Sequence, residues 1–367
     1  MAAMGNTGIN TGSTVYEPLL VRLREQIQTG RVGPGEYLGS EYDMVRQTGL
    51  SRVSVRRAIG HLVKEGLVER RAGKGLFVRS ADRATRTIQI VVPDLTWDRC
   101  VKTVRGIKAA LNRHGIFCQI HDAHDNLDMD IDMIRRLPER HSDGAIIIGL
   151  HERKFTPVLY ELHANNYPFV LIDQQLEDLD IPTVLADNYG GGYHVGLELM
   201  QRGHFRIGFI GMFRPHTGRA RMEGLRDAIN DAGFSFDRSL AIDIEGEEDV
   251  SDWRKRQYRY TQDLLKRKDR PTAVFIQSDA TAMVSYRAIK DLGMKIPDDV
   301  AIVGFDDDPA SQWLDPPLAT VSQQAELIGK TAVDLLRRRL ENPEGPAEHK
   351  VIETVWVPRE SAGKVNL

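Results

Sequence analysis

The chain has 367 residues, 41% of them hydrophobic and 28% charged, a composition typical of a water-soluble protein of two or three domains. Its two cysteines, Cys100 and Cys118, are too few for a disulfide framework or a four-cysteine zinc site. No stretch approaches the roughly 18 apolar residues of a membrane span, and the N-terminus lacks the pattern of a secretory signal. We therefore expect a cytoplasmic protein that is neither secreted nor inserted in a membrane.

The net charge of -3 hides an uneven distribution. Residues 1–87 contain 14 Lys and Arg against 8 Asp and Glu, whereas residues 88–367 contain 35 against 44. A small basic head joined to a large acidic body is typical of a module that binds a polyanion, followed by a domain of another kind.

The sequence pattern of the head predicts three short helices followed by a β-hairpin. Apolar residues recur at helical spacing over residues 15–29, and Ser40 and Ser51 are placed as N-caps of two further helices. Residues 67–71 and 76–78, with a glycine-rich turn between them, predict the hairpin. We predict a disordered tail (1–13), a winged helix-turn-helix domain (14–78) and a linker (79–87). The expected apolar stripe of the third helix is Val55, Ala58, Ile59, Leu62 and Val63.

The start of the third helix carries the residues expected to contact DNA. In a helix-turn-helix this helix lies in the major groove, where arginine forks contact guanine or phosphate. Lys74 stands between two glycines at the wing tip, which favours a phosphate or minor-groove contact. The alternative for any single arginine is an ordinary solvated helix face. The candidate DNA-binding residues are Ser40, Ser51, Arg52, Ser54, Arg56, Arg57, Lys74 and Gly75.

The string LGSEYDMVRQTGLSRVSVRRAIGHLVKEGLVERRAGKGLFV (38–78) resembles the GntR family of bacterial transcription regulators. The resemblance places Arg52 and Arg56 on the family's paired DNA-contacting arginines, with Ser54 beside them and Gly75 at the wing tip. The family usually has Pro where Gly39 stands, which implies a looser entry to the second helix. It often has Arg where Tyr42 stands, which removes one expected DNA contact.

From Ile88 onward, strands alternate with helices, which predicts an α/β fold of doubly wound parallel sheets. The expected strands are 88–92, 117–121, 144–148, 169–172, 207–210, 273–276 and 300–305, and the expected helices are 101–113, 191–201, 219–232, 280–292 and 326–340. We predict a two-subdomain sensor over residues 88–367. Its N-subdomain is expected to contain 88–186 and 322–341, and its C-subdomain 187–321 and 342–362.

Polar and aromatic residues follow several of these strands. Open parallel sheets bind ligands beyond the carboxyl ends of their strands. Carboxylates together with an aromatic ring suit a polyhydroxyl ligand, although each Asp alone could be a helix cap or a turn residue. The candidate effector-binding residues are Asp94, Trp97, Gly149, Asp173, Arg221, Trp253, Ser278, Asp279 and Asp306.

The body resembles the sensor domain of LacI/GalR repressors, which shares the periplasmic-binding-protein fold. The matching strings include DNYGGGYHVGLELMQRGHFRIGFIG (187–211), IPDDVAIVGFDD (296–307) and DPPLATVSQ (315–323). The resemblance places Arg221 and Asp306 on the family's effector-binding Arg and Asp. Ala325 replaces a frequent aromatic, and Trp313 is a possible substitute. A GntR-like head on a LacI-like body resembles the arrangement of arabinose-repressor-type regulators.

The expected effector is a sugar or sugar derivative. Arg214, His216, Arg219 and Arg221 lie close together in sequence, so an acidic or phosphorylated sugar is possible, and the alternative is that only Arg221 faces the cleft.

Other ligand and catalytic motifs have little support. The segment from His121 to Asp132 has metal-ligand residue types without zinc or calcium spacing, and Gly190-Gly191-Gly192 is not a nucleotide-binding motif. We expect no metal, no cofactor and no enzymatic activity.

The function expected from the sequence is a homodimeric, effector-responsive transcription factor, most simply a repressor of carbohydrate-utilisation genes, that binds a near-palindromic operator in double-stranded DNA. The alternative is a cytosolic sugar-binding or sugar-handling protein whose head mediates protein contacts.

Overall fold

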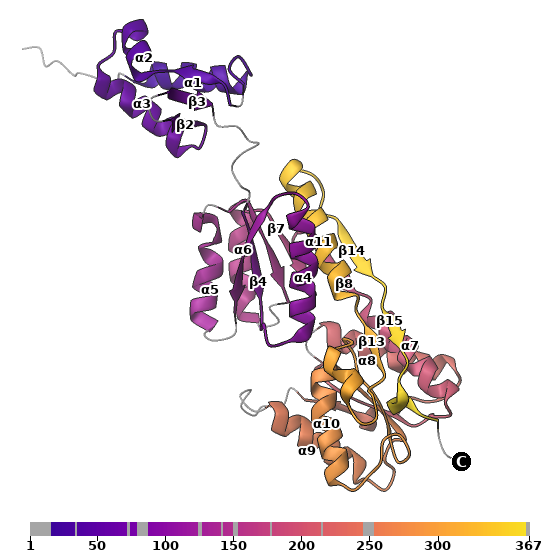
Figure 1. The fold of residues 1–367 in the computed structure, drawn as a ribbon. Helices are drawn as coiled ribbons and strands as arrows, with labels where there is room; N and C mark the ends of the chain where they lie inside the picture. Colours follow the sequence, from indigo (N-terminus) through magenta and orange to yellow (C-terminus); the bar gives the residue numbers. More distant parts are fainter. Residues whose placement is uncertain are drawn as a thin grey trace, which may run out of the picture. The chain divides into compact units, whose positions relative to one another are not determined.

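The computed structural model describes residues 16–33, 35–71, 74–78, 87–123, 127–140, 142–149, 153–176, 178–213, 216–244 and 253–364. The chain divides into two compact units, Met1–Thr85 and Arg86–Leu367 (Figure 1). The expected tail and almost all of the expected linker lie outside the described residues.

The first unit contains three helices and a small antiparallel sheet. The helices are α1 (Glu17–Gln28), α2 (Glu41–Thr48) and α3 (Arg52–Lys64). The sheet has the order β1-β3-β2, formed by β1 (Tyr37–Gly39), β2 (Val68–Arg71) and β3 (Gly75–Val78). Strand β1 was not expected from the sequence. Its three residues carry no alternation of apolar and polar side chains, and its position comes from pairing with β3.

Local signals fix the helix-turn-helix. The Ser40 hydroxyl accepts from the Asp43 backbone N–H at 3.1 Å, and the Asp43 carboxylate accepts from the Ser40 N–H at 3.3 Å, which forms a capping box. These two reciprocal hydrogen bonds fix the first turn of α2 directly after Gly39. Gly39 has a φ of +127°, which proline, held near -65°, cannot adopt, so the glycine suits this backbone.

The apolar stripe of α3 is confirmed for four of its five members. Val55, Ala58, Ile59 and Leu62 are completely buried against α1 and the wing. The prediction for Val63 is wrong, because its side chain is 39% exposed. Val63 lies next to Leu62 in sequence and is therefore rotated about 100° away from the buried face.

The second unit is built on two parallel sheets. The larger, in the N-subdomain, has the order β14-β8-β7-β6-β4-β5. Helices α4 and α11 cover one face, and α5 and α6 cover the other (Figure 1). The elements are β4 (Thr87–Val92), α4 (Asp98–Asn112), β5 (Phe117–Asp122), α5 (Leu127–Arg135), β6 (Gly144–Ile148), α6 (Thr156–Ala164), β7 (Phe169–Ile172), β8 (Thr183–Ala186), α11 (Ala325–Glu341) and β14 (His349–Ile352).

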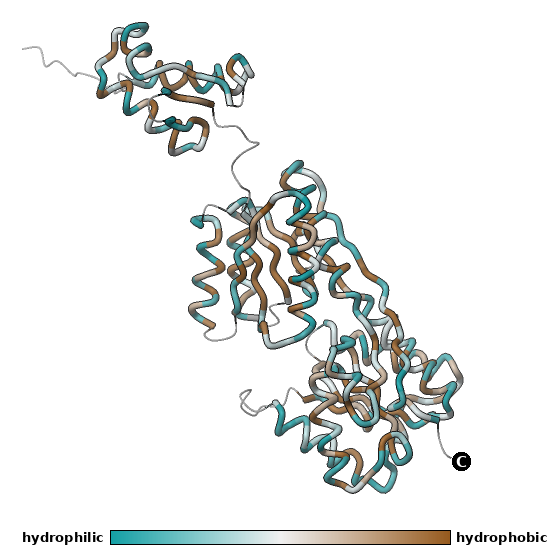
Figure 2. Tube along the Cα trace, viewed as in Figure 1, coloured by the Kyte–Doolittle hydropathy of each residue, from teal (hydrophilic) through white to brown (hydrophobic). Residues whose placement is uncertain are grey.

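The smaller sheet, in the C-subdomain, has the order β10-β9-β11-β12. Helices α7 and α8 pack on one face, and α9 and α10 pack on the other. In both subdomains the strands form the apolar interior, as Figure 2 shows. The elements are α7 (Asn188–Gln201), β9 (Ile207–Gly211), α8 (His216–Asp231), β10 (Ala241–Asp243), α9 (Trp253–Leu265), β11 (Ala273–Ile276), α10 (Asp279–Asp291) and β12 (Ala301–Val303), followed by the antiparallel pair β13 (Thr320–Ser322) and β15 (Val355–Val357). Short 3-10 helices occur at Leu137–Arg140, Arg153–Phe155, Arg238–Leu240, Pro309–Trp313 and Glu360–Ala362.

One expected subdomain boundary is wrong. Residues 342–362 were expected in the C-subdomain, but β14 pairs in parallel with β8 and completes the edge of the larger sheet. The segment therefore stays with the N-subdomain until about residue 352. Strand β14 escapes sequence reasoning because its side chains are mostly exposed, which leaves no apolar pattern to detect.

Three crossovers connect the two subdomains and are hydrogen-bonded to one another. The Asp187 N–H donates to the Ile352 carbonyl at 2.8 Å, and the Gln324 side-chain amide donates to the Glu353 carbonyl at 2.8 Å. Gln324 itself has a left-handed backbone, with a φ of +54°. We call this hydrogen-bonded group of three connections the hinge.

Candidate DNA-binding and effector sites

The candidate DNA contacts of the head lie at the start of α3 and on the wing. Arg52, Arg56 and Arg57 are exposed in the first two turns of α3, and Lys74 is exposed in the turn before β3. The arrangement presents cations from both the helix and the wing. A helix N-terminus with its surrounding arginines also favours phosphate.

The serines among the candidates have local partners. Ser51 is the N-cap of α3: its hydroxyl accepts from the Ser54 backbone N–H at 3.1 Å and lies 3.0 Å from the Ser54 hydroxyl. Ser40 caps α2. Gly75 has a φ of +98°, and an added Cβ would lie 2.7 Å from the ring of Tyr37, so a side chain here would disturb β1.

In the second unit, charged side chains from both subdomains gather at the carboxyl ends of the strands. Asp173 follows β7, and the run Asp306–Asp308 follows β12. Asp173, Asp306 and Asp307 all have positive φ, at 60°, 118° and 53°. Non-glycine residues are rarely held in this conformation, and such residues occur preferentially at ligand sites.

On the N-subdomain side, Arg99 forms an ion pair with the buried Asp173. Burial opposes the charge of Arg99, but Asp173 above all, with Asp306 and Asp308, raises its pKa. The buried Asp94 accepts from the N–H and the hydroxyl of Thr96, at 2.7 and 2.6 Å. Arg99 was not among the residues expected from the sequence.

Two other N-subdomain candidates lie in the same loops. Gly149 follows β6, is buried and donates its N–H to the Ile172 carbonyl at 2.8 Å. Trp97 is the N-cap residue of α4, with a ring that is 41% exposed.

On the C-subdomain side, Arg221 is 7% exposed and held at several points. Its Nε donates to the Asn188 amide oxygen at 2.8 Å, and Nη1 donates to the Gln277 carbonyl. The guanidinium lies 3.7 Å from the centre of the Phe305 ring, a cation–π contact. Burial lowers the pKa of Arg221 to about 10, an effect that the nearby Asp306 opposes.

Asp306 and Asp279 have different surroundings. Burial raises the pKa of Asp306, and Gln323 donates to its carboxylate. Asp279 is completely buried and accepts from the Asp308 N–H, the Ser311 hydroxyl and the Thr320 hydroxyl, at 2.8, 2.6 and 2.6 Å. Burial, together with Asp306, raises its pKa to about 7. Both Asp279 oxygens are therefore engaged in holding the loop after β12.

The remaining candidates lie at helix ends. Ser278 caps α10, and its hydroxyl accepts from the Thr281 N–H at 3.4 Å. Trp253 is half-buried at the start of α9, with the Arg254 guanidinium 4.5 Å from its ring centre. Trp313 does not replace the missing aromatic, because its side chain is 82% exposed. His216 and Arg219 are exposed, and Arg214 lies outside the described residues.

In the loops after β7 and β12, three oxygens are buried and have no hydrogen-bond partner among the residues that the structure describes: Asp173 Oδ1, Gln174 Oε1 and Asp308 Oδ1. They come from both subdomains. Burial, with Asp306 and Asp279 nearby, raises the pKa of Asp308 to about 8. Lys102 crosses the cleft and donates to the Asp307 carbonyl.

Sequence reasoning missed several members of this cluster, namely Arg99, Lys102, Gln174, Asn188, Asp308 and Gln323. Asp308 could have been found, because it continues the acidic run after β12. Arg99 and Lys102 lie within helix α4, where nothing in the sequence distinguishes them from solvated residues.

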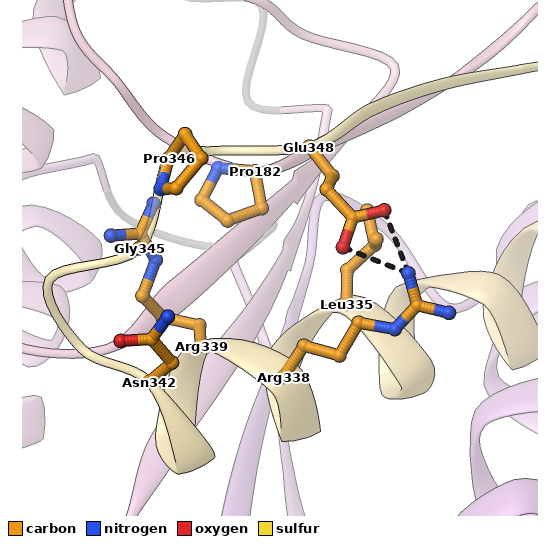
Figure 3. Close-up of a pocket in the computed structure, with 8 residues that line it drawn as sticks. All are labelled: Pro182, Leu335, Arg338, Arg339, Asn342, Gly345, Pro346 and Glu348. Carbon is orange, nitrogen blue, oxygen red and sulfur yellow. Dashed lines mark hydrogen bonds and ion pairs between the residues drawn. The ribbon is translucent and has the colours of Figure 1, made fainter.

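A separate cavity of about 420 Å³ lies at the other end of the larger sheet (Figure 3). Its lining includes Pro182, directly before β8, and Arg338 near the end of α11. Arg338 Nη1 donates to both carboxylate oxygens of Glu348, at 2.7 and 2.8 Å. The strands β8 and β14 begin beside this cavity. It therefore lies at the amino ends of the strands, opposite to the charged cluster at their carboxyl ends.

No helix among the described residues is both long and apolar enough to cross a membrane. Over the same residues, no group of three His, Cys, Asp or Glu side chains has an arrangement suited to a metal ion.

Two family models match the chain. The model for bacterial regulatory proteins of the gntR family covers residues 15–78, and a periplasmic binding protein-like domain covers residues 197–362. The ribose operon repressor of Haemophilus influenzae is 32% identical over 54% of this chain and 58% of its own length. The HTH-type transcriptional repressor CytR of Escherichia coli is 30% identical over 69% of this chain and 72% of its own length.

Solved structures agree with these matches. A LacI family transcriptional regulator from Enterococcus faecium with bound ribose is 27% identical, with a TM-score of 0.66, over 77% of this chain and all of that chain. The CelR–cellobiose complex is 26% identical, with a TM-score of 0.67, over 84% of this chain and 90% of that chain. The chain therefore belongs to the LacI-type family of transcriptional regulators, and its DNA-binding domain is of the GntR type.

Proposed function

We propose that this regulator is a repressor of carbohydrate-utilisation genes whose operator affinity changes when a small sugar-like ligand enters the cleft between its two subdomains. The observation that carries this proposal is the buried cluster of charged and acceptor groups where the strands of both sheets end. Relatives named as a ribose operon repressor and as a cellobiose complex support a sugar effector.

The head is proposed to contact DNA through α3 and the wing. Arg52, Arg56 and Arg57 would contact base edges or phosphates in the major groove, with Lys74 on the adjoining backbone. Ser54, next to the cap residue Ser51, would add a polar contact, and Ser40 would contribute by fixing the start of α2. Gly75 would let the wing tip approach the DNA closely.

The cleft favours a ligand rich in hydrogen-bond donors. Asp173 Oδ1 and Gln174 Oε1 are acceptors, and the hydroxyl groups of a polyol, which both donate and accept, would satisfy them and the Asp308 carboxyl from both sides. An added carboxylate or phosphate would instead meet the carboxyl groups of Asp173 and Asp306. We therefore propose a neutral sugar, held by Asp173 and Arg99 on one wall and by Arg221 and Asp306 on the other.

Ligand binding would act on DNA through closure of the cleft. Lys102 already joins α4 to the loop after β12, and Arg99 lies near the same loop. A ligand that contacts both walls would favour the closed arrangement over the open one, and the hinge would convert closure into rotation of the N-subdomain. In a dimer, that rotation would change the spacing of the two heads.

A homodimer is proposed because the larger sheet has an exposed edge. Among the strands that the structure describes, β5 pairs with β4 alone, and its Phe117 and Ile120 are 64% and 39% exposed. An apolar sheet edge needs covering to avoid non-specific pairing. A second copy would cover it and supply a second head for a near-palindromic operator.

We further propose that the protein acts in the cytoplasm of a bacterium, where its operator lies, and binds its ligand without converting it. The relatives named above are regulators, which supports a binding role.

A ligand screen on the full chain tests the proposal. Thermal unfolding would be followed with neutral sugars, amino sugars, sugar acids and sugar phosphates, since a specific ligand stabilises the folded state by mass action. We expect stabilisation by a neutral sugar that is lost in Arg221→Ala. Stabilisation by sugar acids or phosphates alone would contradict the proposed chemistry of the cleft.

A further inference from the structure

One acidic side chain lies among the cations of the proposed DNA-contacting surface. Glu41 is the first residue of α2, and its carboxylate accepts from Arg56 Nε at 2.8 Å. The other carboxylate oxygen lies 3.2 Å from Arg70 Nη1 on strand β2. Glu41 thus joins three elements of the head: α2, the proposed recognition helix α3 and the wing.

The two arginines remain accessible despite this contact. The side chains of Arg56 and Arg70 are 65% and 51% exposed, whereas that of Glu41 is 29% exposed. The carboxylate therefore lies beneath the guanidinium groups. If Glu41 served only to stabilise the head it would contribute little, because exposed ion pairs are weak.

The geometry of the Arg56 contact indicates another role. A guanidinium can contact guanine through a pair of parallel N–H groups. Glu41 engages Nε, so the terminal Nη1 and Nη2 groups form the pair that is available to a base. An arginine fixed in this way loses less side-chain entropy on binding than a mobile one.

We propose that Glu41 is a positioning residue for DNA recognition, which orients Arg56 end-on toward the groove and ties the wing to the same point through Arg70. The inference rests on the proposed function in one respect, that Arg56 contacts DNA. Glu41 places a negative charge near the phosphate backbone, and we infer that the selectivity gained by orienting Arg56 outweighs this repulsion.

The test uses full-length protein and the sequence that the wild type selects from a random DNA pool. Affinity is measured for this sequence and for unrelated DNA with the wild type, Glu41→Ala, Glu41→Gln and Arg56→Ala. Glu65→Gln is the matched control, because Glu65 accepts from Arg24 at 2.6 Å elsewhere on the head and its loss removes the same charge.

We expect Glu41→Ala to lower the ratio of specific to non-specific affinity about ten-fold, the scale of one good base contact. Affinity for unrelated DNA should stay the same or rise, because a negative charge is removed. Glu41→Gln keeps an acceptor and should fall between Glu41→Ala and the wild type. Glu65→Gln should leave the ratio unchanged.

Two further measurements separate positioning from simpler roles. Added to Arg56→Ala, the Glu41→Ala change should lower the ratio clearly less than it does in the wild type, because only the contact with Arg70 then remains to be lost. Thermal unfolding of each variant shows whether the head is intact. If Glu41→Ala unfolds, the affinity ratio of Glu41→Gln is compared with that of the wild type instead.

If Glu41→Ala raised the affinity for the selected sequence and for unrelated DNA equally, the inference would be overturned, because Glu41 would then only repel DNA. An additive loss on the Arg56→Ala background would also overturn it. A wild type that selects no sequence would instead contradict the proposed function itself.

Discussion

The two units of the chain use arginine in opposite surroundings. In the head, Arg52, Arg56 and Arg57 stand in solvent at the start of one helix. In the sensor, Arg221 is 7% exposed and is fixed by an amide, a carbonyl and an aromatic ring. Exposed charges contribute little to folding and are available to a polyanion, whereas buried charges depend on their partners.

The comparison explains why the exposed arginines of the head should tolerate substitution better than the buried arginine of the sensor. A head arginine can be removed with little change in folding, and the loss appears in DNA binding. Removal of the buried Arg221 leaves the Asn188 amide oxygen and the Gln277 carbonyl without their donor. The predictions below test this contrast, beginning with the largest expected effect.

Substitution of Arg52 or Arg56 by Ala should lower operator affinity by about a hundred-fold, since each removes a forked contact and a positive charge. The affinity for the sugar ligand and the melting temperature of the sensor should not change. Gel shift at two salt concentrations and a ligand titration give the two readouts. Loss of ligand binding in these variants would show that the units are not independent.

Substitution of Arg221 by Ala should destabilise the sensor by about 3 kcal/mol, because it leaves the Asn188 amide oxygen and the Gln277 carbonyl without their donor in the interior. The melting temperature should fall by about 5–10 °C, and the ligand should no longer stabilise the protein. Arg226→Ala is the control, since Arg226 lies on the same helix α8 in an exposed pair with Asp227. Equal effects of the two variants would contradict the contrast drawn above.

The raised pKa of Asp308, about 8, predicts a dependence of stability on pH. Asp308 faces Asp306, Asp279, Asp98 and Lys102. The unfolded carboxyl ionises near pH 4 and the folded one near pH 8, so the folded state holds the extra proton between these values. Stability from this group is therefore present at low pH and is lost as pH rises through about 8.

Asp308→Asn should remove this contribution. The melting temperature of the variant minus that of the wild type should rise between pH 5 and pH 8 and level off above pH 8. A difference that stays constant over the whole range would mean that Asp308 is ionised throughout.

The smallest effect is expected at the cavity of Figure 3. Glu348→Gln removes the charge that pairs with Arg338, and both side chains are well exposed. The melting temperature and the ligand affinity should both match those of the wild type, as measured in the same thermal and titration experiments. A change in ligand affinity here would assign the cavity a part in effector binding.

The contrast between the units also explains which structural elements could be predicted from the sequence. The helices of the head follow from adjacent signals, such as Ser40 with Asp43 and the buried stripe of α3. The strands β6, β7 and β11 are runs of buried apolar residues and were predicted with their observed bounds. These features are local, so periodicity and capping are sufficient to find them.

The residues of the proposed effector site, in contrast, lie far apart in the sequence. Arg99 and Asp173 lie 74 positions apart, and Lys102 and Asp307 lie 205 apart. The fold of the N-subdomain brings Arg99 to Asp173, and the contact between the two subdomains brings Lys102 to Asp307. Glu41 escaped prediction for a related reason, because its partners Arg56 and Arg70 come from a helix and a strand whose relative position the sequence does not state.

The most direct test of the account measures operator affinity of the full chain with and without a saturating concentration of the sugar found by thermal shift. We predict a change of at least ten-fold, within the usual range of coupling between two sites, and no change in Arg221→Ala. A ligand that stabilises the sensor yet leaves operator affinity unaltered would contradict the claim that the cleft controls the head.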